Sequence, residues 1–221
     1  MIIRISLACT LYFPLDIFNI TYSRRKCAQA RLDRLAPCLG LTLFQELQTV
    51  LTTSLIISRL RYGALIFGGA TKQNLIKLMS QQKKAVRNLT SKPKKYHTEQ
   101  LFKNNNLLKL TDIILFERLM FCHKVRYSKL PSSFNNFLNF RQDFNTNRDR
   151  EKAGNFIIPP YIKNCSIRFP HIEAAKDWNN LPLYLKNITK TGEFKKSLTT
   201  YLISKYEDEC LKLNCYICKK L

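Results

Sequence analysis

Residues 51–95 read LTTSLIISRLRYGALIFGGATKQNLIKLMSQQKKAVRNLTSKPKK, and their pattern predicts two helices joined by a glycine-containing hinge. In the first helix, one set of residues recurs at a spacing close to 3.6 residues and forms a stripe that should be buried. The stripe runs through Leu43, Leu47, Val50, Leu51, Ser54, Leu55 and Leu60. The hinge is predicted at Gly63 and at Gly68–Gly69, because glycine adopts backbone angles that other residues avoid.

The second helix of this stretch is predicted to be amphipathic, with a positively charged outer face. Its apolar stripe is formed by Leu75, Leu78, Gln82, Ala85, Val86 and Leu89. Between Lys72 and Lys95 the chain carries eight Lys and Arg residues and no Asp or Glu. A solvated helix face normally mixes both signs, because like charges one turn apart repel. A face of one sign indicates a polyanionic partner, and the alternative is a surface that only keeps the chain soluble.

The charge of the whole chain favours the partner over the solubilising surface. Its 37 Lys and Arg stand against 15 Asp and Glu, a net charge of +22 with a pI near 9.9, whereas a magnitude of about 2 to 8 suffices for a small domain. Nucleic acid is therefore the expected partner, bound through phosphates with a strong salt dependence and little sequence preference. The predicted contact residues are Lys72, Lys77, Lys83, Lys84, Arg87, Lys94 and Lys95.

The distribution of apolar residues and cysteines favours an intracellular protein, nuclear or cytoplasmic. No uncharged apolar run approaches the roughly 18 residues of a membrane-spanning helix, so we expect no membrane partner. The apolar segment near the N-terminus is short and lacks a clear cleavage site for a secretory signal. The cysteines are scattered rather than densely spaced as in secreted disulfide scaffolds; they are Cys9, Cys27, Cys38, Cys122, Cys165, Cys210, Cys215 and Cys218.

Downstream of the basic stretch, helical patterns continue and define a mainly α fold. Thr98 is a predicted N-cap for a short helix, and Thr111 is a predicted N-cap for a helix over 112–127. That longer helix should bury Ile113, Phe116, Leu119, Met120 and His123. A helix over 172–179 should follow Pro170 and bury Ala174, Ala175 and Trp178, and a last helix, capped by Thr189 or Thr191, should carry Phe194, Leu198, Tyr201 and Leu202 at helical spacing.

The segment 129–164 interrupts these helices and suggests a boundary between two modules. It is rich in Asn and Pro and has little intrinsic secondary structure. We predict an unassigned segment 1–22, a basic helical module 23–128, an extended connector 129–164, a smaller helical module 165–206 and a cysteine-containing tail 207–221. Residues 165–169 alternate briefly and predict a strand or an extended edge.

No catalytic site is recognisable, and no cofactor is expected. The histidines stand in unrelated contexts, so a catalytic triad is unsupported, and nucleotide-binding glycine loops are absent. The acidic triplet 207–209 is interpreted as a solvated helix face. Cys210, Cys215 and Cys218 form C-x4-C-x2-C, whose last pair has zinc-ligand spacing, but a local fourth ligand is missing. These cysteines are weak zinc candidates or ordinary reduced thiols.

Aromatic residues near basic ones offer a second way to contact nucleic acid, by stacking on bases. These residues are Tyr62, Phe67, Tyr96, Phe102, Phe169 and Trp178. Most aromatics at helical spacing belong to a core, however. For Trp178, which follows Ala174 and Ala175 on one stripe, burial is the expected role.

A series of short motifs, in this order, resembles the region beyond the catalytic core of reverse transcriptases from jockey-like non-LTR retrotransposons. The motifs are Leu60-x-Tyr62-Gly63-x-x-x-Phe67-Gly68, Gln82-Lys83-Lys84-Ala85-Val86-Arg87, His97-Thr98-x-x-Leu101-Phe102, Asn145-Thr146-x-Arg148, Ser166-Ile167-Arg168-Phe169, Trp178-Asn179-x-Leu181-Pro182 and Phe194-Lys195-Lys196. The likeness extends over residues 27–206. Phe67 stands where the family more often has Trp, and one residue, Asn147, is inserted in the Asn-Thr-Arg element.

The resemblance implies a thumb-like helical module followed by a C-terminal connector, which would contact RNA or an RNA–DNA duplex. The family's palm, with its Tyr-x-Asp-Asp carboxylates, is absent from the sequence. We therefore expect a fragment of an RNA-directed DNA polymerase that binds nucleic acid but does not catalyse on its own. The alternatives are a thumb subunit completed by a separate palm chain and a small interaction protein organised by zinc at the cysteine tail.

Overall fold

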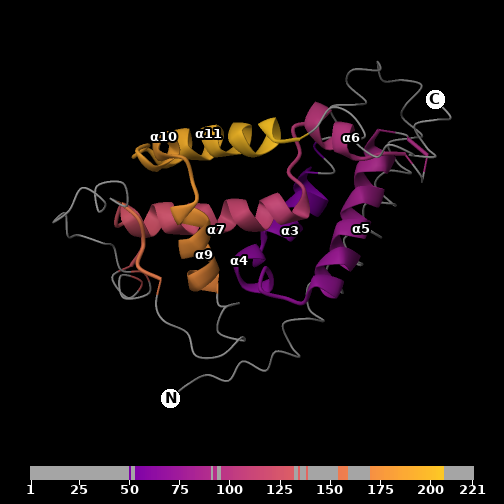
Figure 1. Ribbon diagram of the computed structural model, residues 1–221. Helices are drawn as coiled ribbons and strands as arrows, with labels where there is room; N and C mark the ends of the chain where they lie inside the picture. The colour runs from indigo at the N-terminus through magenta and orange to yellow at the C-terminus, as the bar shows by residue number, and fades with distance from the viewer. Residues whose placement is uncertain are drawn as a thin grey trace. The chain divides into compact units, whose positions relative to one another are not determined.

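The computed structural model describes residues 50, 53–90, 92–93, 96–131, 134, 138, 154–158 and 170–206, and these residues are predominantly helical (Figure 1). Helices account for 69% of the described residues, which confirms the mainly α fold. Within the described ranges, extended pairing is limited to an isolated bridge at Phe156. The strand or extended edge predicted for 165–169 lies outside them.

The helices follow one another with short connections wherever the chain is described. They are the π-helix η2 (Thr53–Ile57) and the α-helices α3 (Ser58–Arg61), α4 (Ala64–Phe67), α5 (Lys72–Leu89), α6 (Glu99–Asn104), α7 (Leu110–Arg126), α9 (Pro170–Asn179), α10 (Leu183–Lys186) and α11 (Thr191–Ser204).

Two compact units share these elements. Unit 1 comprises the described residues up to Leu110 together with 203–206, and unit 2 comprises the described residues from Thr111 to Leu202. This division differs from the predicted modules, because α7 and α9, expected on opposite sides of the connector, belong to the same unit. Side-chain contacts join them: Cys122 Sγ donates to the Ala174 carbonyl oxygen over 3.3 Å. Most of the predicted connector 129–164 lies outside the described residues and stays a prediction.

The first helix of the opening stretch buries only part of the predicted stripe. Leu60 is buried and Leu55 half-buried as predicted, but Val50 and Ser54 are exposed, and Ile56 and Ile57, which lie outside the stripe, are buried. The reason is the π-helical turn of η2, which replaces the i→i+4 pattern by i→i+5 and rotates the following side chains away from a 3.6-residue period. Leu43, Leu47 and Leu51 lie outside the described residues.

The predicted hinge is present at Gly63, which has φ +71° and separates α3 from α4. Its carbonyl oxygen accepts the N–H groups of Ile66 and Phe67, so the chain turns and immediately resumes a helix. A residue with a β-carbon rarely adopts this left-handed geometry. Gly68 takes an ordinary right-handed conformation.

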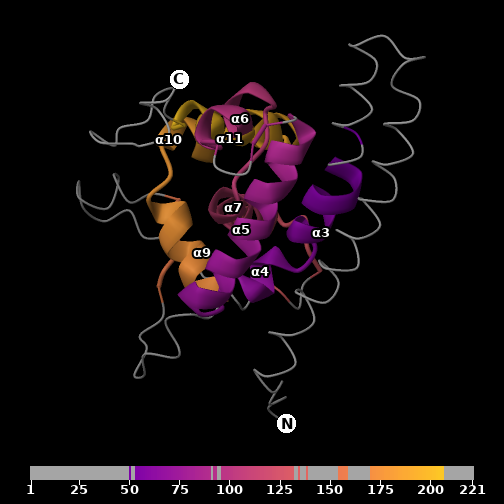
Figure 2. The same ribbon diagram turned by 90° about the vertical axis from the view of Figure 1, so that its right-hand side faces the viewer.

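Helix α5 forms as the sequence predicted. Leu78, Gln82, Ala85, Val86 and Leu89 are buried, and Leu75 is half-buried. Figure 2 shows α5 with α6 near its C-terminal end, and both belong to unit 1. Thr98 occupies the N-cap position of α6 but makes no side-chain capping hydrogen bond.

A buried glutamine fixes α5 within unit 1. Gln82 is fully buried, its Nε2 donates to the Leu108 carbonyl oxygen over 2.8 Å, and its Oε1 accepts the Leu110 N–H over 2.8 Å. Both polar ends of the amide are therefore satisfied by the backbone that leads into α7. The end of the described chain is held similarly, because the Tyr206 hydroxyl accepts the Lys109 N–H over 3.0 Å.

Unit 2 has an aromatic core around α7. All five residues predicted to be buried on this helix are buried, together with Ile114, Cys122 and Val125. Figures 1 and 2 show α11 running along α7, and the His123 ring of α7 stacks on Phe194 of α11. Trp178 is fully buried and donates its Nε1–H to the Gly154 carbonyl oxygen over 3.0 Å, which confirms its core role.

Three boundaries in unit 2 differ from those predicted. Helix α7 begins at Leu110, so Thr111 lies inside the helix and is not its cap. Helix α9 begins at Pro170 and not at residue 172, because a helix needs no N–H at its first position. The short helix α10 after Pro182 was not predicted; four residues are too few for a periodic signal.

Candidate nucleic-acid interface

Helix α5 carries a cationic face opposite its buried face. Lys72, Lys77 and Lys84 are exposed and Lys83 is half-buried. With 3.6 residues per turn, these lysines and Arg87 fall within an arc of about 140°. The buried side chains occupy an arc of about 100° whose centre lies roughly 160° from that of the cations. The positive charges are therefore gathered on one face, as the sequence predicted, and not dispersed around the helix.

No carboxylate in the described part of the chain neutralises this face. Ion pairs elsewhere in the described residues include those of Lys109 with Glu99, of Arg118 with Glu173 and Asp177, and of Lys190 with Glu193. None of them involves Lys72, Lys77, Lys83 or Lys84. These four lysines are called the α5 lysines below.

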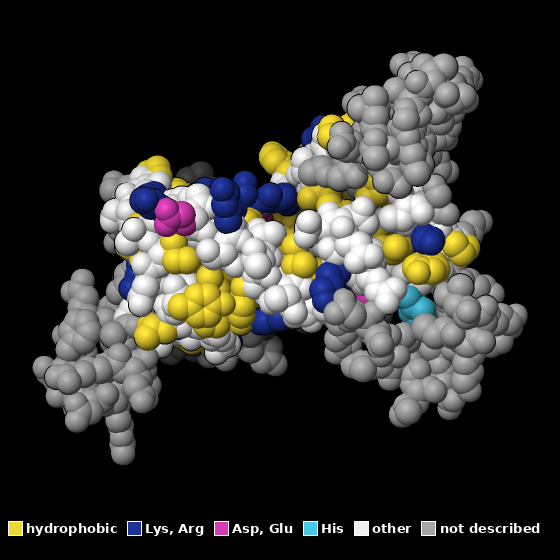
Figure 3. All heavy atoms as spheres, turned by 90° about the horizontal axis from the view of Figure 1, so that it is seen from above, with side chains coloured by type: hydrophobic (Ala, Val, Ile, Leu, Met, Phe, Trp, Pro, Cys, Tyr) yellow, Lys and Arg dark blue, Asp and Glu magenta, His cyan; other side chains and the backbone are white. Residues whose placement is uncertain are grey.

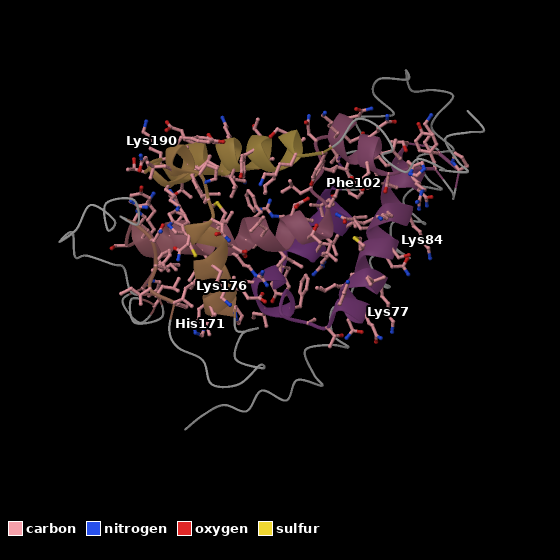
Figure 4. The ribbon with its side chains drawn as sticks, in the orientation of Figure 1. Lys77, Lys84, Phe102, His171, Lys176 and Lys190 are labelled. Atoms are coloured by element: carbon pink, nitrogen blue, oxygen red, sulfur yellow. The ribbon has the colours of Figure 1, made fainter. Side chains whose placement is uncertain are left out.

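The α5 lysines are spread along the helix in a way that suits an extended polyanion. Figure 4 shows Lys77 and Lys84 projecting from the same side of α5. They are seven residues apart, about 10 Å along the helix axis at 1.5 Å per residue, and Lys72 to Lys84 span about 18 Å. A flexible lysine makes a point contact with a phosphate oxygen and needs no fixed geometry. Such contacts position a backbone but do not read bases.

Arg87, the fifth predicted contact residue in α5, is used inside the protein. Its Nε–H donates to the Tyr96 carbonyl oxygen over 2.7 Å, which ties the chain after α5 back to the helix. Burial lowers the pKa of Arg87 from its ordinary value, and a guanidinium remains charged at neutral pH in any case. Arg87 therefore has a structural role, and its replacement would change the fold as well as the charge of this face.

The remaining predicted site residues are not described. Lys94 and Lys95 lie outside the described residues, and so do Cys210, Cys215 and Cys218. Among the residues that are described, no group of three His, Cys, Asp or Glu side chains could hold a metal ion. The same residues include no helix with the length and apolar character needed to cross a bilayer.

The aromatic candidates for base stacking are mostly used in the core. Phe67, Phe102 and Trp178 are buried, and Phe169 lies outside the described residues. Tyr96 is half-buried, with Lys92 Nζ 5.1 Å from its ring centroid. Tyr62, 72% exposed, is the one of the described candidates with a largely open ring face.

Cations in unit 2 mostly have internal partners, which distinguishes them from the α5 lysines. Lys186 is buried, and its ammonium donates to Asn155 Oδ1 and to the carbonyl oxygen of Asn179, the last residue of α9. Burial lowers the pKa of Lys186, and the charge of Arg126 lowers it further. A lysine can cap the end of a helix in this way, and nothing in the sequence sets Lys186 apart from a surface lysine.

Helix α11 carries exposed lysines as well. Figure 3 shows Lys and Arg side chains over α11, with acidic atoms nearby; Lys195 and Lys196 are exposed, and the neighbouring Lys190 pairs with Glu193 over 3.1 Å. Lys195 and Lys196 thus form an exposed cationic pair of the same size as Lys83 and Lys84, but on a different unit.

Comparison with protein-family models, with curated proteins and with solved structures finds no match to this chain.

Proposed function

We propose that this chain binds RNA or an RNA–DNA duplex through backbone phosphates, without sequence preference, and that the α5 lysines make the main contacts. The observation that carries the proposal is the cationic face of α5, which no described carboxylate pairs with and which lies opposite the buried face. The net charge of +22 supports it.

The physical basis is counterion release. Each phosphate that a lysine neutralises frees condensed cations, so the logarithm of the binding constant falls linearly with the logarithm of salt concentration. Four α5 lysines predict a contribution to the slope of about −3.6 on a duplex and about −2.8 on a single strand, at 0.9 and 0.7 per phosphate. Other cations of the chain add to this value.

The test compares two double variants of equal charge change. Lys83→Gln with Lys84→Gln removes half of the α5 lysines, and Lys195→Gln with Lys196→Gln removes the exposed pair of α11. Fluorescence anisotropy with a labelled RNA, and with the matching RNA–DNA duplex, gives affinity at several salt concentrations. We expect the α5 variant to lower the magnitude of the duplex slope by about 1.8. Equal slopes for the α5 variant and the wild type would refute the assignment of α5.

The family resemblance extends the proposal. In this reading the chain represents the thumb and connector region of a jockey-like reverse transcriptase and does not polymerise nucleotides alone. A primer-extension assay on the purified 221-residue chain checks this, with an RNA template, a DNA primer and Mg²⁺. We expect no incorporation, because metal-assisted transfer needs carboxylates from separate elements that converge on two cations. Incorporation by the chain alone would contradict the proposal.

A further inference from the structure

Unit 2 contains a histidine that is fully buried and makes only one hydrogen bond. His123 lies on α7 and is 0% exposed. Its ring stacks on Phe194 of α11, with the centroids 4.3 Å apart and the planes at 15°. Its Nε2 lies 2.9 Å from the carbonyl oxygen of Ile188, in the segment that leads into α11. His123 thus connects α7 to residues 188–202 by both a hydrogen bond and a ring contact.

The hydrogen bonding determines the protonation state of this ring. A carbonyl oxygen only accepts, so Nε2 must carry the proton. Nδ1 is buried and has no hydrogen-bond partner. The neutral ring leaves a lone pair at Nδ1, whereas a protonated ring would place an N–H donor there with no acceptor. A buried donor without a partner is costly, and a buried charge without one is costlier.

The charges around His123 act in the same direction. Burial lowers the pKa of His123 most, the hydrogen bond to the Ile188 carbonyl raises it in part, and the positive charges of Lys129 and Arg126 lower it further, so the pKa lies below its ordinary value. Lys186 of α10 contacts Tyr127 through its backbone, because its carbonyl oxygen accepts the Tyr127 hydroxyl. On α11, Glu193 pairs with Lys190 and is exposed. On α9, Asp177 pairs with Arg118. None of these carboxylates contributes to the pKa of His123.

We propose that His123 is an acid-sensitive latch: its protonation adds an unaccepted donor and a third positive charge to the contact between α7 and residues 188–202, and releases that contact. This inference is independent of nucleic-acid binding. The unfolded chain takes up the proton near the ordinary value of 6.5, and the folded chain does so only at lower pH. The contribution of His123 to stability is therefore fully present above about pH 6.5. As the pH falls below this value the contribution is lost, and the unfolding constant rises by up to about tenfold per pH unit.

Trp178 provides the readout. It is the only tryptophan of the chain, it is fully buried in unit 2, and its ring centroid lies 5.9 Å from that of Phe194. Its fluorescence during denaturant unfolding of the full chain, from about pH 7.5 to about pH 5, follows the region that the latch holds. The test variant is His123→Gln, whose amide can still donate to the Ile188 oxygen but does not titrate.

The matched control is His171→Gln. His171 is half-buried on α9, and burial also lowers its pKa, so it accounts for any general histidine effect. Asp177, whose pKa burial raises, titrates in all three proteins and cancels in the comparison. Because burial lowers the pKa of both histidines, we expect each variant to lose less stability below pH 6.5 than the wild type, and His123→Gln to lose less than His171→Gln. A His123→Gln profile as steep as that of the wild type overturns the proposal.

A second measurement needs no variant, in case His123→Gln does not fold. NMR of the wild-type chain with labelled histidine identifies the His123 ring by its contacts with Phe194. We expect this ring to remain neutral, with the proton on Nε2, as the pH falls through 6.5, and to titrate only as Trp178 becomes exposed. A His123 ring that protonates at or above pH 6.5 overturns the proposal.

Discussion

Replacing Gln82 with methionine tests whether one buried amide holds α5 in place. Methionine has nearly the same length and flexibility, so the change removes the two hydrogen bonds without opening a large cavity. The Leu108 carbonyl and the Leu110 N–H then lose their partners. A buried backbone group without a partner costs about 1–3 kcal/mol, so losing the acceptor of the buried Leu110 N–H alone should cost that much. The half-buried Leu108 carbonyl adds a smaller amount, because water can partly replace its donor. Typical proteins are stable by only about 5–15 kcal/mol.

Two measurements check the Gln82→Met prediction. Denaturant unfolding followed by far-ultraviolet circular dichroism gives the loss of stability, because Trp178 reports unit 2 and not the surroundings of α5. Amide hydrogen exchange gives a local readout: the Leu110 N–H should exchange markedly faster in the variant. A loss below about 0.5 kcal/mol, the size of a neutral surface substitution, with unchanged Leu110 protection, would show that the amide is not what positions α5.

The substitution Gln82→Glu sharpens the same argument. The carboxylate can still accept the Leu110 N–H, but it faces the Leu108 carbonyl oxygen, to which the wild-type amide donates. Only the protonated acid can restore that donor, so the buried site should raise the pKa of this carboxyl. Stability is then lost as the pH rises through that pKa and recovers on acidification. A variant that is least stable at low pH would contradict this reading.

Two further predictions concern backbone geometry and an ion pair. Gly63→Ala should destabilise the chain by about 1–2 kcal/mol, because alanine resists the left-handed geometry. Gly192→Ala is the control: Gly192 has open space around it and no positive φ, so this change should be neutral or stabilising. Thermal melting followed by circular dichroism compares the two variants, and equal effects would disprove the role of φ at Gly63. Arg118→Met should destabilise unit 2 by about 1–3 kcal/mol at neutral pH. The loss should be smaller under acid conditions, because burial raises the pKa of Asp177 and Arg118 lowers it in the wild type. Trp178 fluorescence during denaturant unfolding measures the loss of stability at each pH, and a loss that does not depend on pH would argue against this role of Arg118.

Local patterns of the sequence were sufficient for helices whose burial follows a 3.6-residue period. Helix α5 and its cationic face, the buried residues of α7 and the core position of Trp178 were all predicted, because each depends on side chains one or two turns apart. The predictions failed where that period changes, as in the π-helical turn of η2, and where a helix is too short to show it, as in α10. Thr111 has the residue type of a cap but lies inside α7.

The amino-acid sequence alone determined the helical class of this protein, the place of its basic helix and the sign of its surface charge, since these depend on composition and on local spacing. Only the tertiary structure decided which polar side chains are hydrogen-bonded within the protein. Gln82, Arg87 and Lys186 donate to backbone carbonyl oxygens. The oxygens that Gln82 and Arg87 bind lie outside α5, so the periodic pattern of that helix does not predict them. The proton-sensitive position of His123 depends likewise on Phe194 and Ile188, more than sixty residues away along the chain. Packing brings such groups together, and it is the burial of their charges and donors that sets their chemistry.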